Sequence, residues 1–428
     1  MRSEPDGMLG AVIASESLGL TDTMINGAGG CRSRTQIMMH ELIPTYSKEN
    51  MDCCRSKNFS QQSKLPCTYL NNDDIVFGTS EKIASSIDSV SEITGKRVVL
   101  LDTLGASLIC TDYGRLVLAG GVKPITIEDD LSSLSLAEGY DLVVSKILSV
   151  SDISSGNDGS VNILGYGLVD MGWKEGSGQI VSLLESMGIK VNCVLGCMPS
   201  EESIKSLGKA SLNILIHPEY CRKTAESLKE RFGTPYLRLS EGAPIGYPAI
   251  RSFVTEVANA LGKDPAPALK IIDEDAQAVH SVLMQYDRIP RGFHVRGFTI
   301  EGDSSTVMPI VKWVMTTFGM IPRKITLFDD EYRTELESFL KAHNLAHAME
   351  EGIDGEVEIV FTDGLTALEG RLSRSEIGFV EIRIPWGRQI DLMGRTMAGP
   401  KGCRYLLDEM INSLIRFRCG QPTDLQFR

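Results

Sequence analysis

The chain has 428 residues and a formal net charge of −13. That length exceeds what one hydrophobic core supports, so the sequence predicts two or three domains. Nucleic acids and anionic membrane surfaces both require a clustered basic surface on the protein that binds them. The acidic balance therefore argues against either kind of partner.

The apolar stretches are strand-sized and are interrupted by glycine or by charge, so no transmembrane helix is predicted. Residues 1–7 read MRSEPDG and lack the basic-then-apolar layout of a signal peptide, and Glu16 interrupts the apolar run that follows. The sequence therefore predicts a cytoplasmic protein. Its ten cysteines are then expected as free thiols or metal ligands rather than as a disulfide framework.

Three segments repeat one theme, in which an apolar β-branched run is followed by a glycine-containing turn and a helical pattern. This alternation predicts parallel strands with crossover helices, and hence an α/β fold. The predicted domains are 1–155, 156–265 and 266–428. Two polar connectors, at 149–160 and 263–267, support these boundaries.

The first segment is predicted to hold an amphipathic stretch at 8–19, a glycine turn at 27–31 and a buried strand at 96–102. The predicted elements of the second segment are strands at 161–167, 189–195 and 212–217 and helices at 178–187 and 221–232. Those of the third are strands at 292–300, 323–328 and 357–362 and helices at 308–318 and 402–415.

Between the glycine turn and Gly78 lies a polar, weakly patterned loop at 32–74, which carries Cys53, Cys54 and Cys67. A loop of that length inside a compact domain is usually either functional or disordered, and the cysteines favour function. The loop is too polar to bury enough apolar area to order itself. We therefore expect it to order at a subunit interface.

The turn GAGGC at 27–31 follows a short apolar run, which first suggests a dinucleotide fingerprint. Such a fingerprint needs an acid about 20 residues later at a strand end, whereas Glu49 lies inside the polar loop. No G-x-x-x-x-G-K-[ST] sequence occurs, so no P-loop is predicted. Two interpretations remain open: Gly29 and Gly30 let the backbone approach a cofactor and present Cys31, or the turn is simply tight and the thiol is buried.

The chain contains no C-x-x-C pair, so a zinc ribbon or a ferredoxin-type cluster held by this chain alone is not predicted. Cys53 and Cys54 are adjacent, and they are either loop thiols or cluster ligands. Cys67 and Cys110 are better placed. Cys110 lies beyond the carboxyl end of a predicted strand, where α/β proteins place their sites.

His217 ends a predicted strand and is the best placed of the six histidines for site chemistry, although a hydrogen bond to a nearby carbonyl is the simpler alternative. Cys197 ends another strand and either faces a cleft or packs in the core. Arg32 follows the glycine turn and either pairs with a substrate carboxylate or belongs to the surface. His343 and His347 lie four apart without an intervening glutamate, which favours a solvated helix face over a zinc site.

Five segments, in order along nearly the whole chain, resemble nitrogenase component 1 and its relatives. NGAGGC at 26–31 is similar to the family turn H-G-P-x-G-C, whose cysteine ligates an iron–sulfur cluster. The other four are DDIVFGTSEK at 73–82 (D-x-V-F-G-G-x-x-K-L), DTLGASLICTD at 102–112 (T-T-C-x-x-E-L-I-G-D-D), FGTPY at 232–236 (Y-G-I-P-[WY]) and GPKGCRYLLDEM at 399–410 (G-x-x-G-x-x-x-L-x-x-x-[IM]).

The chain also departs from the family pattern. Leu104 stands where T-T-C has its cysteine, and no cysteine precedes the first helix, so only Cys31 remains of the usual three cluster ligands. His217 stands where the family has the cysteine ligand of its molybdenum–iron cofactor, and Ala398 stands where it has the histidine ligand. Because of these departures we expect no molybdenum–iron cofactor in this chain, and we expect it to catalyse a reaction other than dinitrogen reduction.

The resemblance implies three Rossmann-like domains with parallel sheets around a shared cleft, assembled as a homodimer or with a similar subunit. It implies an iron–sulfur cluster, of the [4Fe–4S] type, at a subunit interface, supplied with electrons by a separate ATP-dependent iron protein. Cys31 is the expected metal ligand. A four-iron cluster needs about four ligands, so Cys67, Cys54 and Cys110, or a partner subunit, are expected to complete the set.

The substrate implied by the resemblance is a small molecule or a tetrapyrrole, and His217, Arg32 and Cys197 are the candidates for the cleft that holds it. One alternative is a scaffold or assembly subunit that binds a metallocofactor or tetrapyrrole without turnover, since Leu104 replaces a ligand. Another, a nicotinamide-dependent dehydrogenase, requires an acid at the end of the second strand, which the sequence lacks.

Overall fold

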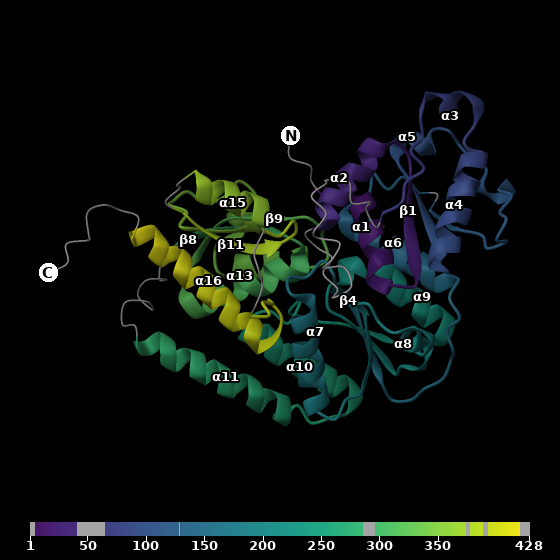
Figure 1. Ribbon diagram of the computed structural model, residues 1–428. Coiled ribbons are helices and arrows are strands. Elements are labelled where there is room, and N and C mark those ends of the chain that lie inside the picture. Colours follow the sequence, from purple (N-terminus) through teal and green to yellow (C-terminus); the bar gives the residue numbers. More distant parts are fainter. Residues whose placement is uncertain are drawn as a thin grey trace. The chain divides into compact units, whose positions relative to one another are not determined.

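The computed structural model describes residues 5–40, 65–127, 129–285, 296–373, 377–387 and 393–419. They form helices and three parallel β-sheets, shown in Figure 1. The predicted α/β fold is therefore confirmed. In this part of the chain, no helix combines the length and the apolar character needed to cross a membrane.

The chain folds into two compact units. Unit 1 comprises Met1–Gly156, Leu195–Lys209 and Tyr220–Gly233, and unit 2 comprises Asn157–Val194, Ala210–Glu219 and Thr234–Arg428. Each of the three sheets is built within one of the three predicted domain segments. The boundaries proposed between those segments stay a prediction, because two stretches of the second segment belong to unit 1.

Unit 1 contains a sheet in the order β1-β2-β3, in which neighbouring strands run parallel. Its strands are β1 (Thr21–Asn26), β2 (Arg97–Asp102) and β3 (Ile125–Ile127). Its helices are α1 (Gly7–Leu18), α2 (Gly29–His40), α3 (Asn72–Phe77), α4 (Ser80–Thr94), α5 (Leu104–Ser107), α6 (Leu136–Ser149), α8 (Glu201–Lys205) and α9 (Arg222–Phe232).

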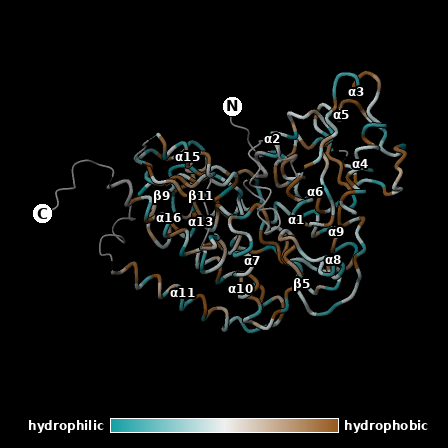
Figure 2. The backbone as a smooth tube through the Cα atoms, in the orientation of Figure 1, coloured by the Kyte–Doolittle hydropathy of each residue, from teal (hydrophilic) through white to brown (hydrophobic). Residues whose placement is uncertain are grey.

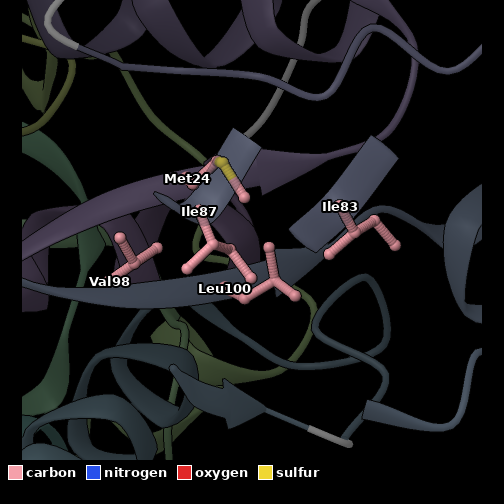
Figure 3. Close-up of a cluster of buried hydrophobic side chains, with 5 residues drawn as sticks. All are labelled: Met24, Ile83, Ile87, Val98 and Leu100. Carbon is pink, nitrogen blue, oxygen red and sulfur yellow. The ribbon is translucent and has the colours of Figure 1, made fainter. Parts of the chain in front are cut away.

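One face of this sheet is covered by α4. Met24 of β1 and Val98 and Leu100 of β2 pack with Ile83 and Ile87 of α4, and all five side chains are buried (Figure 3). The isoleucines lie four residues apart, which places them on one stripe of the helix. Burial of this stripe fixes α4 on the sheet.

Helix α1 differs from the amphipathic stretch that the sequence predicts. Each of its residues except Glu16 is buried, because α1 packs against β1 and also against α6. The close approach of the two helices depends on glycine. A Cβ at Gly10 would lie 2.0 Å from the carbonyl oxygen of Leu136, and one at Gly139 would lie 2.2 Å from that of Gly7.

Unit 2 contains two four-stranded sheets, in the orders β5-β4-β6-β7 and β11-β10-β8-β9. The strands of the first are β4 (Val161–Gly167), β5 (Val191–Gly196), β6 (Leu212–Leu215) and β7 (Tyr236–Arg238). Those of the second are β8 (Gly297–Gly302), β9 (Ile321–Leu327), β10 (Ile359–Asp363) and β11 (Gly378–Arg383).

The helices of unit 2 are α7 (Trp173–Ser186), α10 (Tyr247–Leu261), α11 (Ala266–Gln285), α13 (Ser304–Phe318), α14 (Arg333–Ala342), α15 (Gly364–Leu372) and α16 (Gly399–Cys419). Hydrophobic and hydrophilic segments alternate along α11 (Figure 2). Its inner residues Ala268 and Ile272 are buried, whereas Val282 and Met284 near its carboxyl end are exposed.

The sheet orders place a topological switch point in each sheet of unit 2. In the first sheet the chain proceeds outward from β4 to β5 and then returns to β6 on the other side of β4. The connection that follows β4 leads to one side of the β4–β6 pair, and the connection that follows β6 leads to the other side. Ligands of α/β proteins usually bind at the carboxyl ends of two strands arranged in this way. The sequence pattern predicts both strands but not their order.

Two expectations about local structure are wrong. The predicted loop at 32–74 is helical at both described ends, because α2 continues to His40 and α3 begins at Asn72; residues 41–64 lie outside the described part of the chain. His343 and His347 do not share a helix, since His343 ends α14 and His347 lies in the 3-10 helix Ala346–Met349. Their side chains are nevertheless solvent-accessible, as expected for a solvated surface.

We predict that Gly139→Ala destabilises the protein, because its new methyl group would meet the Gly7 backbone and force α1 and α6 apart. Overpacking of this kind costs about 1–3 kcal/mol. Gly178→Ala on α7 is the matched control, since a Cβ there meets nothing within 4 Å and alanine favours the helix. Denaturant unfolding should show a lower midpoint for the first variant only. Equal midpoints would contradict the close α1–α6 approach.

Candidate functional site

The glycine turn after β1 brings Cys31 to the first turn of α2, where its side chain is exposed. The glycine that the turn requires is Gly27, because a Cβ there would lie 2.3 Å from Oγ1 of Thr103 at the end of β2. Gly29 has the Tyr69 ring beside it, and Gly30 faces open space.

The segment with Cys67 runs parallel to β1 along its carboxyl-terminal half. The Ile25 N–H donates to the carbonyl of Pro66 at 2.9 Å, and the Thr68 N–H donates to the carbonyl of Ile25 at 3.0 Å. Ile25 and Cys67 thus form a parallel bridge. This pairing holds the second thiol beside the turn that carries the first.

A chain of hydrogen-bonded polar groups, buried at Asn26 and Thr68 and half-buried at Asp102 and Tyr113, secures both cysteine-bearing segments. The Thr68 hydroxyl accepts the Gly27 N–H at 3.0 Å and donates to the side-chain oxygen of Asn26 at 2.9 Å. The Asn26 amide donates to Asp102 at 2.9 Å, and the Tyr113 hydroxyl donates to the same carboxylate at 2.6 Å. Burial raises the pKa of Asp102, and the bonds from Tyr113 and Asn26 oppose that rise.

The Cys67 thiol is half-buried and sits among polar groups. Its sulfur donates to the carbonyl of Gly27 at 3.3 Å and accepts the N–H of Tyr69 at 3.4 Å. Burial raises the pKa of Cys67, the Tyr69 N–H and the Arg32 charge lower it, and charge on Cys31 raises it further. The two thiols are therefore close enough to interact electrostatically.

The structure assigns Arg32 to the support of this pair. Its Nε donates to the carbonyl of Leu65 at 3.1 Å, and its guanidinium lies 5.6 Å from the centre of the Tyr69 ring. Cys110 is exposed, has a positive φ of 54° and donates to the carbonyl of Ser107. Cys54 lies outside the described residues, as does Cys53.

Two thiols from one chain fit part of an iron–sulfur ligand set. Thiolate sulfurs that accept backbone N–H bonds are usual around such clusters, and the Tyr69 N–H supplies one. Across the described ranges, however, no group of three or more His, Cys, Asp or Glu side chains is arranged to hold a metal. Cys31 and Cys67 can therefore supply two ligands, and a cluster with four ligands would need two more.

A second group of chemically active residues lies in unit 2, at the switch point of the β5-β4-β6-β7 sheet. Asp170 follows β4 by three residues, and His217 follows β6 by two. His217 Nε2 lies 3.0 Å from Oδ1 of Asp170, and Nδ1 lies 2.6 Å from the Ser305 hydroxyl at the start of α13. The Ser305 hydroxyl in turn donates to Glu219 at 2.5 Å.

The pKa values of two groups in this network, His217 and Glu219, are raised. Burial lowers the pKa of His217, but the charge and hydrogen bond of Asp170, with smaller effects from Glu219 and Asp303, raise it to about 9. Burial raises the pKa of Glu219 well above its usual value, and the charge of Asp329 adds to the rise. A pKa of about 9 favours the positively charged imidazole at neutral pH, although the His217 side chain is only 5% exposed.

His217 and Asp170 both line a cavity of about 220 Å³, a volume that includes space open to solvent. The other lining residues are Tyr166, Met171, Ile216, Ala243, Pro244, Ile245, Met397 and Ala398. Tyr166 stacks on His217 with the ring centres 6.2 Å apart. Only about 10 Å³ of that space admits the centre of a water molecule, which is room for about one water.

Only some of the sequence-predicted site residues fall into these two groups. Cys31 and Cys67 come together, and His217 and Ala398 line one cavity, whereas neither Arg32 nor Cys197 lines it. Both ring nitrogens of His217 are engaged and Ala398 has no donor atom, so this pair does not fit a molybdenum–iron cofactor.

Sequence reasoning missed three members of the histidine network, namely Asp170, Glu219 and Ser305. Asp170 and Ser305 each follow a strand closely, and that position is the one signal that could have found them. Glu219 lies two residues after His217, but its partner Ser305 is 86 residues further along the chain, so the sequence did not reveal their contact.

Comparison with known proteins shows the family. A family model described as nitrogenase component 1 type oxidoreductase matches residues 7–415. The chain belongs to this family. The sequence-based recognition of the family is therefore confirmed.

The chain is also similar to curated oxidoreductases. One of the subunits of light-independent protochlorophyllide reductase, from Methylobacterium sp. (strain 4-46), is 28% identical over 188 residues, which cover 44% of this chain and 35% of that relative. The same subunit from Rhodospirillum rubrum is 35% identical over 108 residues, which cover 25% of this chain and 19% of that relative. The match thus spans about a third or less of the length of these relatives.

Solved structures support the fold. A structure of nitrogenase Cp1 at pH 6.5 superposes with a TM-score of 0.76 at 16% identity, and the match covers 100% of this chain and 96% of that one. A second, of nitrogenase Cp1 at pH 5, gives a TM-score of 0.69 at 15% identity, covering 98% and 90%. At this level of identity the likeness shows the shared fold.

We predict that the free energy of unfolding falls as the pH rises from about 6.5 to about 9. The pKa of His217 is raised in the folded state, so its stabilising contribution is complete below the unfolded value of 6.5 and is lost as the pH passes through about 9. This difference corresponds to a loss on the order of 3 kcal/mol.

His217→Gln should remove most of this slope, whereas His343→Gln, at the exposed end of α14, should keep it. Denaturant unfolding at several pH values measures the slope. The same slope in wild type and His217→Gln would contradict a charged, buried imidazole.

Proposed function

We propose that this chain is a reductase subunit that accepts electrons through an iron–sulfur cluster at an interface between two chains and reduces an organic substrate other than dinitrogen. The observation that carries the proposal is the Cys31–Cys67 pair at the carboxyl end of β1. The bound cluster, of the [4Fe–4S] type, would supply one-electron storage and transfer.

The number of ligands supports an interface. Cys31 and Cys67 supply two thiols per chain, so two copies of the chain, arranged as a homodimer, supply the four that a four-iron cluster needs. A similar paired subunit that carries two ligands of its own would satisfy the same requirement. Cys110 and Cys54 stay candidates for ligands.

The surface near the thiol pair also supports an interface. None of the residues of α3 is buried, and Phe77 at its end is 85% exposed. Leu104 and Leu108, next to Cys110, are 55% and 76% exposed, and Tyr69 is half-exposed. Hydrophobic segments lie at the tip of unit 1 that carries α3 (Figure 2). Apolar side chains gathered around a site indicate a surface that another chain covers.

The electron donor that the resemblance implies is a separate ATP-dependent iron protein. The chain has no G-x-x-x-x-G-K-[ST] sequence, so a division of labour in which another protein hydrolyses ATP fits its residues. The names of the curated relatives support an unsaturated tetrapyrrole as one class of substrate.

A second candidate is a scaffold or assembly subunit that binds a metallocofactor or tetrapyrrole without turning it over. Leu104 favours this candidate, because it replaces a cysteine of the family pattern and lies exposed. A neighbouring gene for an iron-protein reductase would support the enzyme, whereas cofactor-maturation genes would support the scaffold. An anaerobic assay of the purified chain with a reduced iron protein, ATP and a candidate tetrapyrrole distinguishes the two candidates. A reductase subunit should reduce a double bond of the tetrapyrrole, whereas a scaffold should leave the tetrapyrrole unchanged.

We predict that Cys31→Ala and Cys67→Ala each strongly lower the iron and acid-labile sulfide of anaerobically purified protein. Cys31 is exposed and Cys67 is half-buried, so neither substitution removes a core side chain and the fold should remain. Cys193→Ala, in the buried part of β5, is the matched control and should keep its iron.

Iron and sulfide analysis with EPR of the reduced protein measures the loss. Sedimentation gives the number of chains in the assembly, and for the wild type the two measurements together should give about four irons per two chains. Unchanged iron content and EPR signal in both single variants would exclude this pair as ligands.

We also predict that the purified chain neither binds nor hydrolyses ATP, because its sequence has no loop of the kind that cradles phosphates. Isothermal titration with ATP and Mg²⁺ and a phosphate-release assay test this directly. Stoichiometric binding or steady ATPase activity in pure protein would refute the need for a separate iron protein.

A further inference from the structure

The segments that carry Cys31 and Cys67 are joined by the side chain of Arg32, the residue that follows Cys31. Its Nε donates to the carbonyl of Leu65 at 3.1 Å, and its guanidinium lies 5.6 Å from the centre of the Tyr69 ring. Leu65 and Tyr69 lie two residues before and two residues after Cys67. Arg32 therefore holds the start of α2 against the segment on both sides of Cys67.

The sulfur of Cys67 points toward the turn that leads into Cys31. Sγ of Cys67 lies 3.3 Å from the carbonyl oxygen of Gly27 and 4.0 Å from that of Ala28. The Ala28 oxygen also accepts the Cys31 N–H at 3.2 Å. One carbonyl oxygen thus contacts the backbone of the first cysteine and the sulfur of the second. Cys31 is exposed, so no packing prevents its side chain from turning toward that sulfur.

Backbone hydrogen bonds fix the segment with Cys67 beside the turn. On one side of Cys67 the Ile25 N–H donates to the carbonyl of Pro66, and on the other side the Leu70 N–H donates to the carbonyl of Gly27, each at 2.9 Å. Two thiols held on fixed segments meet at a high effective concentration. They therefore favour a bond with each other over a lasting bond with a separate molecule.

The two thiols differ in their access to solvent. Cys31 is exposed, whereas Cys67 is half-buried and its sulfur accepts the Tyr69 N–H at 3.4 Å. Thiol–disulfide exchange begins at a thiol that an incoming disulfide can reach, and it ends when a second thiol displaces the first adduct. Cys31 fits the attacking thiol, and Cys67 fits the thiol that completes the exchange.

We propose that Cys31 and Cys67 form a reversible disulfide site, which closes in the chain without a cluster and must open before these thiols can bind iron. Arg32 acts as the positioning residue, because it joins the two segments. The mutual exclusion of disulfide and cluster rests on the proposed function, whereas the disulfide itself does not.

A small-molecule disulfide such as oxidised glutathione is the oxidant. The thiolate sulfur of Cys31 attacks one sulfur of this reagent, the sulfur–sulfur bond of the reagent breaks, and one glutathione leaves as a thiolate. Cys67 gives its proton to that thiolate, and its sulfur attacks the sulfur of Cys31. The second glutathione leaves and takes up from solvent the proton that Cys31 released. Two protein thiols are oxidised to one disulfide, and one glutathione disulfide is reduced to two thiols.

The disulfide is tested in the full chain, freed of metal by a chelator and fully reduced. The chain is equilibrated anaerobically in buffers of reduced and oxidised glutathione, quenched with acid and alkylated. Mass spectrometry of its peptides should show a Cys31–Cys67 disulfide that excess reduced glutathione reverses. Cys110→Ser, which removes another exposed thiol of unit 1, is the control and should keep this disulfide.

Three results of this experiment would overturn the proposal. They are the absence of the linked peptide, glutathione that stays on Cys31 without closure, and a disulfide of Cys31 with a cysteine other than Cys67.

The role of Arg32 is tested by the ratio of disulfide to dithiol at a fixed composition of the glutathione buffer. Arg32→Ala should lower this ratio about tenfold or more, the factor expected when a hydrogen bond from a charged group is lost. Arg32→Lys keeps a charged donor and should restore part of the ratio. Arg34→Ala is the matched control, because Arg34 pairs with Asp6, and it should leave the ratio unchanged. The wild-type ratio in Arg32→Ala would contradict the positioning role.

Iron-loaded protein separates this proposal from the proposed function. Protein purified anaerobically with its iron should form no disulfide in the same buffers until a chelator removes the iron. A disulfide that forms equally in both preparations would contradict the pair as cluster ligands, although the disulfide site would stand. No disulfide in the iron-free chain would overturn the present proposal and would leave the proposed ligands in place.

Discussion

The ion pair between Asp170 and His217 is the interaction on which the interior of unit 2 depends. Burial alone would make the imidazole neutral, because transfer of a charge out of water is costly unless a partner compensates it. Asp170 supplies that compensation at 3.0 Å. The pair can form because β4 and β6 are neighbours whose carboxyl ends meet, so the strand order decides the protonation state of the site.

Unit 1 uses the same edge of its sheet for different chemistry. At the carboxyl ends of β1 and β2, the turn requires glycine at position 27, because a Cβ there would meet Thr103. The hydrogen-bonded polar groups from Thr68 to Asp102 hold the segment that carries Cys67. The result is a pair of thiols that cannot complete a cluster alone, beside exposed apolar side chains. Our proposal assigns electron transfer to unit 1.

The errors of the sequence analysis have physical causes. The stretch at 8–19 is predicted to be amphipathic, and Ser15 and Ser17 are polar residues within it. In the structure both hydroxyls are buried and bonded, Ser15 to Thr21 at 2.8 Å and Ser17 to the carbonyl of Ala14 at 2.8 Å. The start of the polar loop is helical because α2 continues past Cys31 without a glycine or proline to end it. Polarity alone did not distinguish a surface helix from a loop.

The sequence by itself determined the fold class, since β-branched runs and helical periods alternate along the chain and leave a parallel α/β arrangement as the consistent solution. It also determined the family, and it singled out Cys31 and His217 by their positions after strands. Only the tertiary structure decided which groups these residues meet. Gly27 bonds to Thr68 across 41 residues, and His217 bonds to Ser305 across 88. Local patterns carry no information about such pairs, because their distance depends on strand order and on the path of the connections.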